Sequence, residues 1–343
     1  MSRPTVNDIA KEAGVSLATV DRVLNARPGV RAKTVVRVNE AIERLGYVRD
    51  VAAANLARRR SYRVAFVLPD SRTTFMQALR TAIATAAGLA AFDRTAAAIV
   101  SVAAFDPTAT VRALAALEGV DGVALMAPET PQVRDAIGRL AEAGIPVVAL
   151  VSDQPNSART RFVGINNLAA GRTAAQLVGR FAGRPDPTVM VVAGSMMARV
   201  QMERGTGFDE MMLSSFPGAT VLPSIEGRDD SEVVARRLAE ALAAHPEVDA
   251  LYALGAGHRG LTRILASSAR ARRLTVVAHE LTPAARAALE DGTFDAVITQ
   301  DVGHIARSAL RVLRAAIDGT PLDPGQEQIR IEILLRENLP PAG

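Results

Sequence analysis

The sequence predicts an α/β protein in which a small helical domain precedes a larger, doubly wound parallel-sheet domain with two lobes. Three observations support this prediction. Two short amphipathic helices joined by a glycine lie within residues 5–25. Positive charge gathers in the same region, because residues 1–60 hold twelve Lys or Arg against six Asp or Glu, whereas residues 61–343 hold 28 against 30. From residue 62 onward, strand-like apolar runs alternate with helical patterns.

The first motif is a pair of short helices with a sharp turn between them. Apolar residues recur at i, i+3, i+4 and i+7 from Val6 to Ala13, which puts one apolar stripe on a short helix. Gly14 is expected to end that helix, because glycine accepts the positive φ just past a helix C-terminus. Ser16 has a hydroxyl suited to cap the next helix, in which Val20 starts the buried stripe. The pattern predicts a helix-turn-helix.

The second helix of this motif leaves one face free for DNA. Leu17, Ala18 and Arg22 lie opposite its buried stripe. Arginine reads guanine in the major groove and small apolar groups meet the thymine methyl, so we expect these residues to contact base edges. Any two amphipathic helices joined by glycine share the pattern, but the positive charge of this region favours DNA. Phosphate contacts are expected from Thr5, Ser16, Thr19, Asn25, Arg31 and Thr34.

A third helix and a linker complete the N-terminal region. The helix is expected from about Ala32, and Gly46 should end it. Residues 50–57 are rich in alanine and too short to form a stable helix alone in water, so they should fold only when supported. A plain flexible linker is the alternative for this segment.

A long ungapped motif runs through this N-terminal region. Its segments are Asp8–Ala10, Ala13–Ser16, Thr19–Val20, Arg22–Asn25, Val30, Lys33–Thr34 and Leu45–Tyr47. The motif resembles the headpiece of the lactose repressor/galactose repressor family of bacterial transcription regulators. The resemblance implies a headpiece at residues 1–48, a hinge helix at 49–61 and a two-lobed sensor of the periplasmic-binding-protein type I fold at 62–343. It also implies that Ala53 and Leu56 meet the minor groove, where an apolar wedge bends DNA.

Two sets of strand-like runs make up the remainder of the chain. Continuous apolar and β-branched runs separated by amphipathic helices predict parallel sheets covered on both faces. We expect the first lobe to comprise about residues 62–165 and 296–325, and the second about residues 166–295 and 326–340. Ligands bind outside the carboxyl ends of parallel strands, so residues just after the runs should line a site between the lobes.

Polar side chains occur at several of these strand ends. Together they offer fixed hydrogen-bond partners to the hydroxyls of a polyol, although any one of them alone is more typical of a helix cap or a solvated loop. The resemblance adds that Arg204 holds a sugar and that Glu280 replaces the family's effector-binding aspartate. The expected effector-binding residues are Phe75, Glu129, Asn166, Arg204, His258, Glu280 and Gln300.

The sequence offers no catalytic, metal or cofactor motif. Cysteine is absent, the four histidines are scattered, and neither Gly-x-Gly-x-x-Gly nor Gly-x-x-x-x-Gly-Lys occurs after a strand-like run. We therefore expect no enzyme, no cofactor and no metal. A sugar-binding or nucleotide-dependent enzyme fused to a headpiece is the alternative, and a transport receptor is a third possibility.

The sequence is interpreted as a homodimeric regulator, a repressor, that binds a pseudo-palindromic operator and responds to a small polar effector, a sugar or sugar derivative. No signal peptide is recognised, because Met1 runs directly into the helix-turn-helix, and no apolar run approaches the roughly 20 residues that a membrane span needs. We therefore expect a cytoplasmic, nucleoid-associated protein with no membrane partner.

Overall fold

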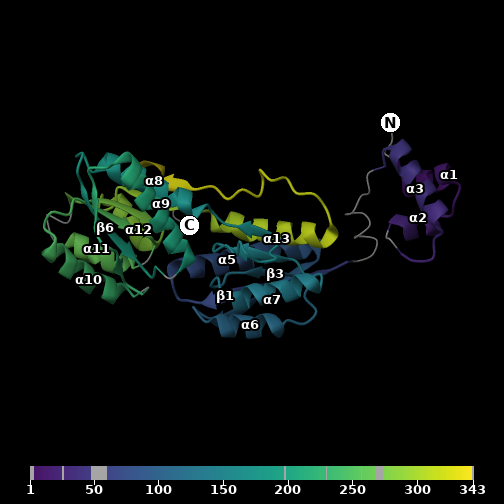
Figure 1. Cartoon of the computed structure of the whole chain (residues 1–343), viewed down its shortest axis with the longest axis horizontal. Helices are drawn as coiled ribbons and strands as arrows, with labels where there is room; N and C mark the ends of the chain where they lie inside the picture. Colours follow the sequence, from purple (N-terminus) through teal and green to yellow (C-terminus); the bar gives the residue numbers. More distant parts are fainter. Residues whose placement is uncertain are drawn as a thin grey trace. The chain divides into compact units, whose positions relative to one another are not determined.

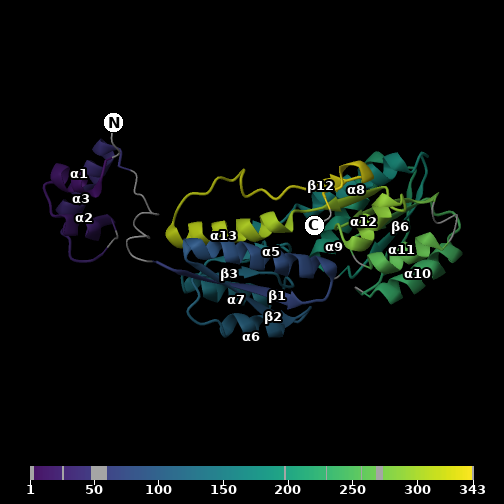
Figure 2. The same cartoon turned by 180° about the vertical axis from the view of Figure 1, so that it is seen from behind.

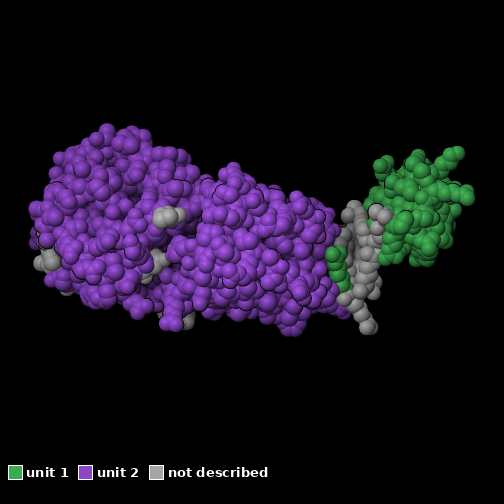
Figure 3. Space-filling model, turned by 60° about the horizontal axis from the view of Figure 1, so that its bottom comes forward, with its two compact units in different colours: residues 1–60 green, residues 61–343 purple. Residues whose placement is uncertain are grey.

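The protein consists of two compact units, residues 1–60 and residues 61–343 (Figure 3). A computed structural model describes residues 4–24, 27–47, 60–196, 198–228, 230–255, 257–267 and 273–341. Within these ranges the first unit is helical, and the second contains two sheets with helices on their faces (Figure 1).

The first unit contains the predicted helix-turn-helix and third helix. Its helices are α1 (Val6–Ala13), α2 (Leu17–Leu24) and α3 (Ala32–Leu45). The expected turn is confirmed, because Gly14 adopts φ 61° and ψ 42° directly after α1. The expected cap is confirmed as well, since the Ser16 hydroxyl accepts from the N–H of Thr19 at 3.2 Å. Buried side chains from all three helices form one core, which consists of Ile9, Ala10, Ala13, Val20, Val38 and Ala41.

The first lobe of the second unit is built on a parallel sheet. Its strands are β1 (Tyr62–Asp70), β2 (Thr95–Ala103), β3 (Gly122–Leu125), β4 (Val147–Leu150) and β5 (Arg161–Val163). Its helices are α5 (Thr74–Ala90), the 3₁₀ turn η1 (Ala91–Asp93), α6 (Pro107–Ala115), α7 (Pro131–Glu142) and α13 (Val302–Asp318). The strand order is β2-β1-β3-β4-β5. Phe66 of β1 packs with α5 and α13, and Val67 packs with α6 and α7, so helices cover both faces.

The second lobe has a larger sheet of the same kind. Its strands are β6 (Thr188–Ala193), β7 (Thr220–Val221), β8 (Ile225–Glu226), β9 (Ala250–Ala253), β10 (Thr275–His279), β11 (Ala296–Thr299) and β12 (Glu332–Leu334). Its helices are α8 (Asn167–Phe181), α9 (Arg199–Ser215), α10 (Ser231–Ala244), α11 (His258–Ala266), α12 (Pro283–Glu290) and the 3₁₀ turn η3 (Arg336–Asn338). The strand order is β12-β11-β10-β9-β6-β7, and β12 alone runs antiparallel to its neighbour among the described strands. The predicted pair of doubly wound lobes is confirmed (Figure 2).

Strand β11 lies in a different lobe from the one that the sequence predicts. We expected residues 296–325 in the first lobe, but β11 pairs with β10 and β12 in the second sheet. The physical reason is that a short buried apolar strand suits either sheet, so its sequence does not say which strands it will join. The chain returns to the first lobe only with α13.

The stretch that begins with helix α5 contradicts the expectation that no apolar run is long enough to span a membrane. By length and composition alone, the stretch Thr74–Asp93 is apolar enough to cross a membrane. In the structure, however, its Met76, Leu79 and Ile83 side chains pack into the core beneath the first sheet. It therefore packs on the first lobe along one face, and 22% of the apolar stretch is buried.

Helix α13 links two distant points of the second unit. Asp301, one residue after Gln300, caps its first turn by accepting from the N–H of His304 at 2.9 Å. At the other end, the Tyr62 hydroxyl donates to Asp318 at 2.7 Å, and the Arg314 guanidinium lies 5.4 Å over the Tyr62 ring. The helix thus connects the carboxyl edge of the second sheet to the start of β1.

Candidate functional site

The first candidate surface is the outer face of α2. Leu17 is 50% exposed, and Ala18 and Arg22 are also exposed, so none of these three side chains is used in the core of the first unit. The Ser16 and Thr19 hydroxyls are hydrogen-bonded to each other at 2.9 Å at the start of the helix. This face has the size and chemistry of a helix that enters the major groove.

The expected phosphate-contacting residues surround the same motif. The N–H and the hydroxyl of Thr5 both donate to Asp8 at 2.7 Å, and these bonds hold the pKa of Asp8 below its usual value. Arg31 is exposed at the start of α3, and Thr34 is half-buried one turn later. Their contacts to phosphate remain predictions. Asn25, Ala53 and Leu56 lie outside the described residues.

The second candidate site is a buried polar cluster at the carboxyl edge of the second sheet. Arg204 of α9 is only 2% exposed. Its guanidinium donates to Asn167 at 3.0 Å, to the Leu254 carbonyl at 2.9 Å and to Glu280 at 2.8 Å. Gln300 donates to the same Glu280 oxygen at 3.1 Å. Three of the expected effector-binding residues, Arg204, Glu280 and Gln300, are therefore brought together by α9, β10 and β11.

Glu280 holds an unusual backbone conformation in this cluster. Its φ is 70°, which L-residues other than Asn and Asp seldom adopt and which costs on the order of 1–3 kcal/mol. The conformation is held by a hydrogen bond from its N–H to the Ile298 carbonyl at 2.8 Å and by the ion pair with Arg204. Gln300 also has a buried side-chain oxygen with no partner among the described residues. Strain and an unused acceptor are both typical of ligand sites.

Two buried histidines support the cluster from inside the second lobe. His279 is fully buried and shares a 2.8 Å hydrogen bond with the Tyr252 hydroxyl. Burial, and then the nearby Arg204 charge, lowers the pKa of His279 well below its usual value. His258 is bonded to the Thr282 hydroxyl at 2.9 Å, and burial lowers its pKa to about 4. Both rings are therefore neutral near pH 7.

The other expected effector-binding residues lie apart from this cluster. The Asn166 side chain caps α8 by accepting from the N–H of Ala169 at 2.9 Å. Its neighbour Asn167 is the buried partner of Arg204, and no sequence pattern distinguishes it from Asn166. Phe75 is half-buried against the core, and Glu129 of the first lobe is paired with Arg199 of α9 and with Asn156. Whether these residues touch an effector remains a prediction.

Arg204 is positioned by a close contact between helices α8 and α9. A Cβ atom on Gly171 of α8 would clash with the backbone carbonyl of Arg204, and one on Gly207 of α9 would clash with the carbonyl of Leu168. Glycine at both positions lets the two helices approach closely. This approach places Asn167, at the start of α8, against the Arg204 guanidinium.

Gly171→Ala should destabilise the protein by about 1–3 kcal/mol, because the new methyl group has to push the α9 backbone away. Chemical denaturation measures the loss. Gly138→Ala in α7 is the matched control, since a Cβ there meets no atom within 4 Å, and it should stabilise the chain by about 0.5–1 kcal/mol. Equal stability of the two variants would contradict the proposed role of the α8–α9 contact.

Comparisons of sequence place the two units in known families. The profile described as bacterial regulatory proteins, lacI family, matches residues 5–50, and that described as periplasmic binding protein domain matches residues 64–321. The HTH-type transcriptional regulator CelR of Thermobifida fusca is 27% identical over 351 residues, covering 98% of each chain. Catabolite control protein A of Priestia megaterium is 44% identical over 71 residues, so that the chain spans only 21% of that relative.

Solved structures share the fold of the second unit. A protein described as a LacI transcriptional regulator, from Bacteroides fragilis, is similar with a TM-score of 0.71 at 20% identity, covering 81% of this chain and 98% of that one. A solute-binding protein of Burkholderia graminis in complex with D-arabinose has a TM-score of 0.73 at 24% identity, covering 81% and 96%. At these identities the likeness shows the fold alone.

A helix-turn-helix followed by a sensor of the periplasmic-binding-protein fold defines the class of this protein, which is a DNA-binding regulator of transcription. The chain belongs to the lacI family of bacterial regulatory proteins.

Proposed function

We propose that the protein is a homodimeric repressor whose affinity for a pseudo-palindromic operator changes when a sugar or sugar derivative binds between the two sensor lobes. The observation that carries the proposal is the Arg204–Glu280–Gln300 cluster, which lies at the carboxyl edge of a parallel sheet. A regulator acting on DNA would work in the cytoplasm. The relatives are transcription regulators, and we propose no catalytic role.

The charge of the cluster favours a ligand with hydroxyl groups. Arg204 and Glu280 neutralise each other, and His258 and His279 are uncharged near pH 7. The unpartnered oxygen of Gln300 accepts from a donor such as a hydroxyl. A polyol satisfies these groups because each hydroxyl both donates and accepts.

An exposed apolar surface on the first lobe is an argument for the proposed dimer. Strand β2 lies at the edge of its sheet, where Ile99 is 36% exposed. Leu89 and Phe92, at the end of α5 and in η1, are 62% and 89% exposed. An apolar surface beside an unpaired strand edge is typical of an interface, and a second copy of the chain is the partner that a two-fold operator requires.

Operator binding with and without candidate effectors tests the proposal. The full chain is titrated onto its own upstream DNA by gel shift, with a series of sugars, sugar derivatives and polyols added in turn. A shift in operator affinity with one of them supports the proposal. An effector can change that affinity only as far as it binds the two conformations differently. Steady turnover of a sugar in a parallel assay would favour the enzyme alternative.

Arg22→Ala should weaken operator binding by about 1–3 kcal/mol and relax the preference at one base pair per half-site. The reason is that Arg22 is exposed on α2 beside Leu17 and Ala18 and is free to reach a base edge. Binding isotherms on the operator and on random DNA measure the effect. Equal losses on both DNAs would show that Arg22 contacts only phosphate.

A further inference from the structure

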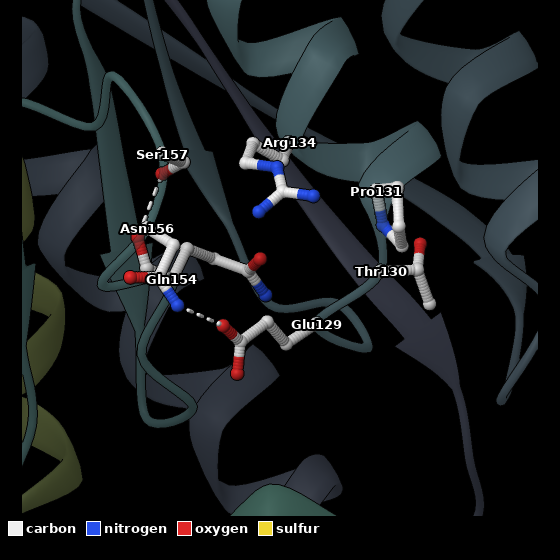
Figure 4. Close-up of a pocket in the computed structure, with 7 residues that line it drawn as sticks. All are labelled: Glu129, Thr130, Pro131, Arg134, Gln154, Asn156 and Ser157. Carbon is white, nitrogen blue, oxygen red and sulfur yellow. Dashed lines mark hydrogen bonds between the residues drawn. The ribbon is translucent and has the colours of Figure 1, made fainter.

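The first lobe has a hollow of about 120 Å³ that the Arg204 cluster does not use. It lies where β3 and β4 end, at the start of α7, and Figure 4 shows Glu129, Arg134, Gln154 and Asn156 around it. The lining is polar. Parallel strands bind ligands at this edge, so the hollow has the position of a ligand subsite.

Gln154 has a buried acceptor directed into this hollow. The residue is only 1% exposed, and its side-chain nitrogen donates to the Ala127 carbonyl at 2.9 Å. This bond fixes the amide, so that the other end, the Oε1 oxygen, faces the hollow with no partner among the described residues. A buried acceptor without a donor is energetically unfavourable. A ligand hydroxyl would supply the missing donor.

The surrounding loop holds Gln154 firmly. Asp153 forms two hydrogen bonds with the Arg159 guanidinium, at 2.5 and 2.8 Å, and the Ser157 hydroxyl donates to the Gln154 carbonyl at 2.7 Å. In a preformed site of this kind, little binding free energy is lost to the ordering of side chains.

Arg134 supplies an unused positive charge on the other side of the hollow. No hydrogen bond or ion pair of its guanidinium is found in the part of the chain that the structure describes, and Figure 4 shows it pointing toward Gln154. Glu129, by contrast, is already paired with Arg199 and with Asn156. The hollow therefore offers one free cation beside one free acceptor.

We propose that this hollow binds the hydroxy-acid end of the effector, with the carboxylate on Arg134 and the neighbouring hydroxyl donating to Gln154. One guanidinium pairs well with one carboxylate in a two-bond fork. A doubly charged phosphate fits worse, because Glu129 and the Gln154 oxygen would face its remaining charge. The proposal rests on the proposed function, and it selects sugar acids over neutral sugars as the effector class.

Ligand-induced thermal shift and calorimetry on the full chain test this inference. The probes are D-gluconate and D-galactonate, in which a hydroxyl stands on the carbon next to the carboxylate, compared with the neutral sugars D-glucose and D-galactose. At least one acid should raise the melting temperature and bind at least about tenfold more tightly than its neutral counterparts. Arg134→Gln should remove that preference. Arg139→Gln, an exposed site on the same helix outside the hollow, should retain it.

The outcomes separate this inference from the proposed function. If no acid binds, or if Arg134→Gln binds the acid as tightly as the Arg139→Gln control, the hollow holds only water and the inference fails. If neutral sugars alone release the operator, the proposed function stands and the inference fails. If no sugar and no sugar acid changes operator affinity, the proposed function fails as well.

Discussion

Arg204→Ala should lower the free energy of unfolding by about 3–5 kcal/mol. The guanidinium is almost fully buried and bonds Asn167, the Leu254 carbonyl and Glu280. Its removal leaves the Glu280 carboxylate buried without a counter-charge. Urea denaturation followed by circular dichroism measures the change, with Arg172→Ala as the control.

The control removes an arginine that is also paired with a glutamate but lies at the surface. Arg172 forms an ion pair with Glu210 at 2.7 Å, and both side chains are about half exposed. Such a pair contributes about 0–1 kcal/mol. Similar losses of unfolding free energy in the two variants would show that the buried ion pair stabilises the fold no more than a surface ion pair does.

The burial of Arg204 also decides which variant best tests the effector response. The sequence alone suggests that Arg204→Ala removes only the response to effector, but the structure makes the residue part of the fold. Gln300→Ala is the better variant, because it removes the unpartnered acceptor of the cluster and leaves the buried Arg204–Glu280 ion pair intact. It should keep operator binding and weaken the effector response.

Lowering the pH from 7 to 5 should destabilise the protein through its buried histidines. Burial lowers the folded-state pKa of His258 to about 4, against 6.5 for the ordinary side chain. The unfolded chain therefore binds the proton more readily, so the stability from His258 is complete above about pH 6.5 and is lost as the pH falls toward 4. The full loss is about 3 kcal/mol, of which about 2 kcal/mol is expected by pH 5. His279 acts in the same direction.

Chemical denaturation at a series of pH values measures this dependence. Most carboxyl groups titrate below this range, and the carboxyls of Asp209 and Asp295, whose pKa values desolvation raises, would raise the stability as the pH falls. A loss of stability between pH 7 and 5 therefore comes from the histidines. His258→Asn keeps a group able to bond Thr282 but does not titrate, and its stability should fall less steeply. A wild-type stability that stays constant over this range would contradict the buried, neutral state of His258.

Local features were predictable from the sequence because their causes are local. The turn at Gly14 and the cap at Ser16 each depend on residues within one helical turn, and both occur as expected. Arg204, Glu280 and Gln300 follow the rule that residues at strand ends meet at one sheet edge.

Features that depend on distant partners were not predictable. Asn166 and Asn167 differ by one position at a helix start, and only the packing of α8 on α9 decides which of them meets Arg204. The lobe of β11 depends on its pairing with β10 and β12. The free Gln154 oxygen arises because a backbone carbonyl 27 residues earlier fixes the other end of its amide.

Helix α13 has a mechanical consequence for the sensor. Its 17 residues span about 25 Å, from the residue after Gln300 to the Asp318 carboxylate that holds Tyr62. Buried side chains along its length pack into the first lobe, so the helix is stiff and resists bending or sliding. Because α13 is fixed to the first lobe along its length, the Gln300 end of the helix and Tyr62, where the chain enters β1, belong to one rigid body.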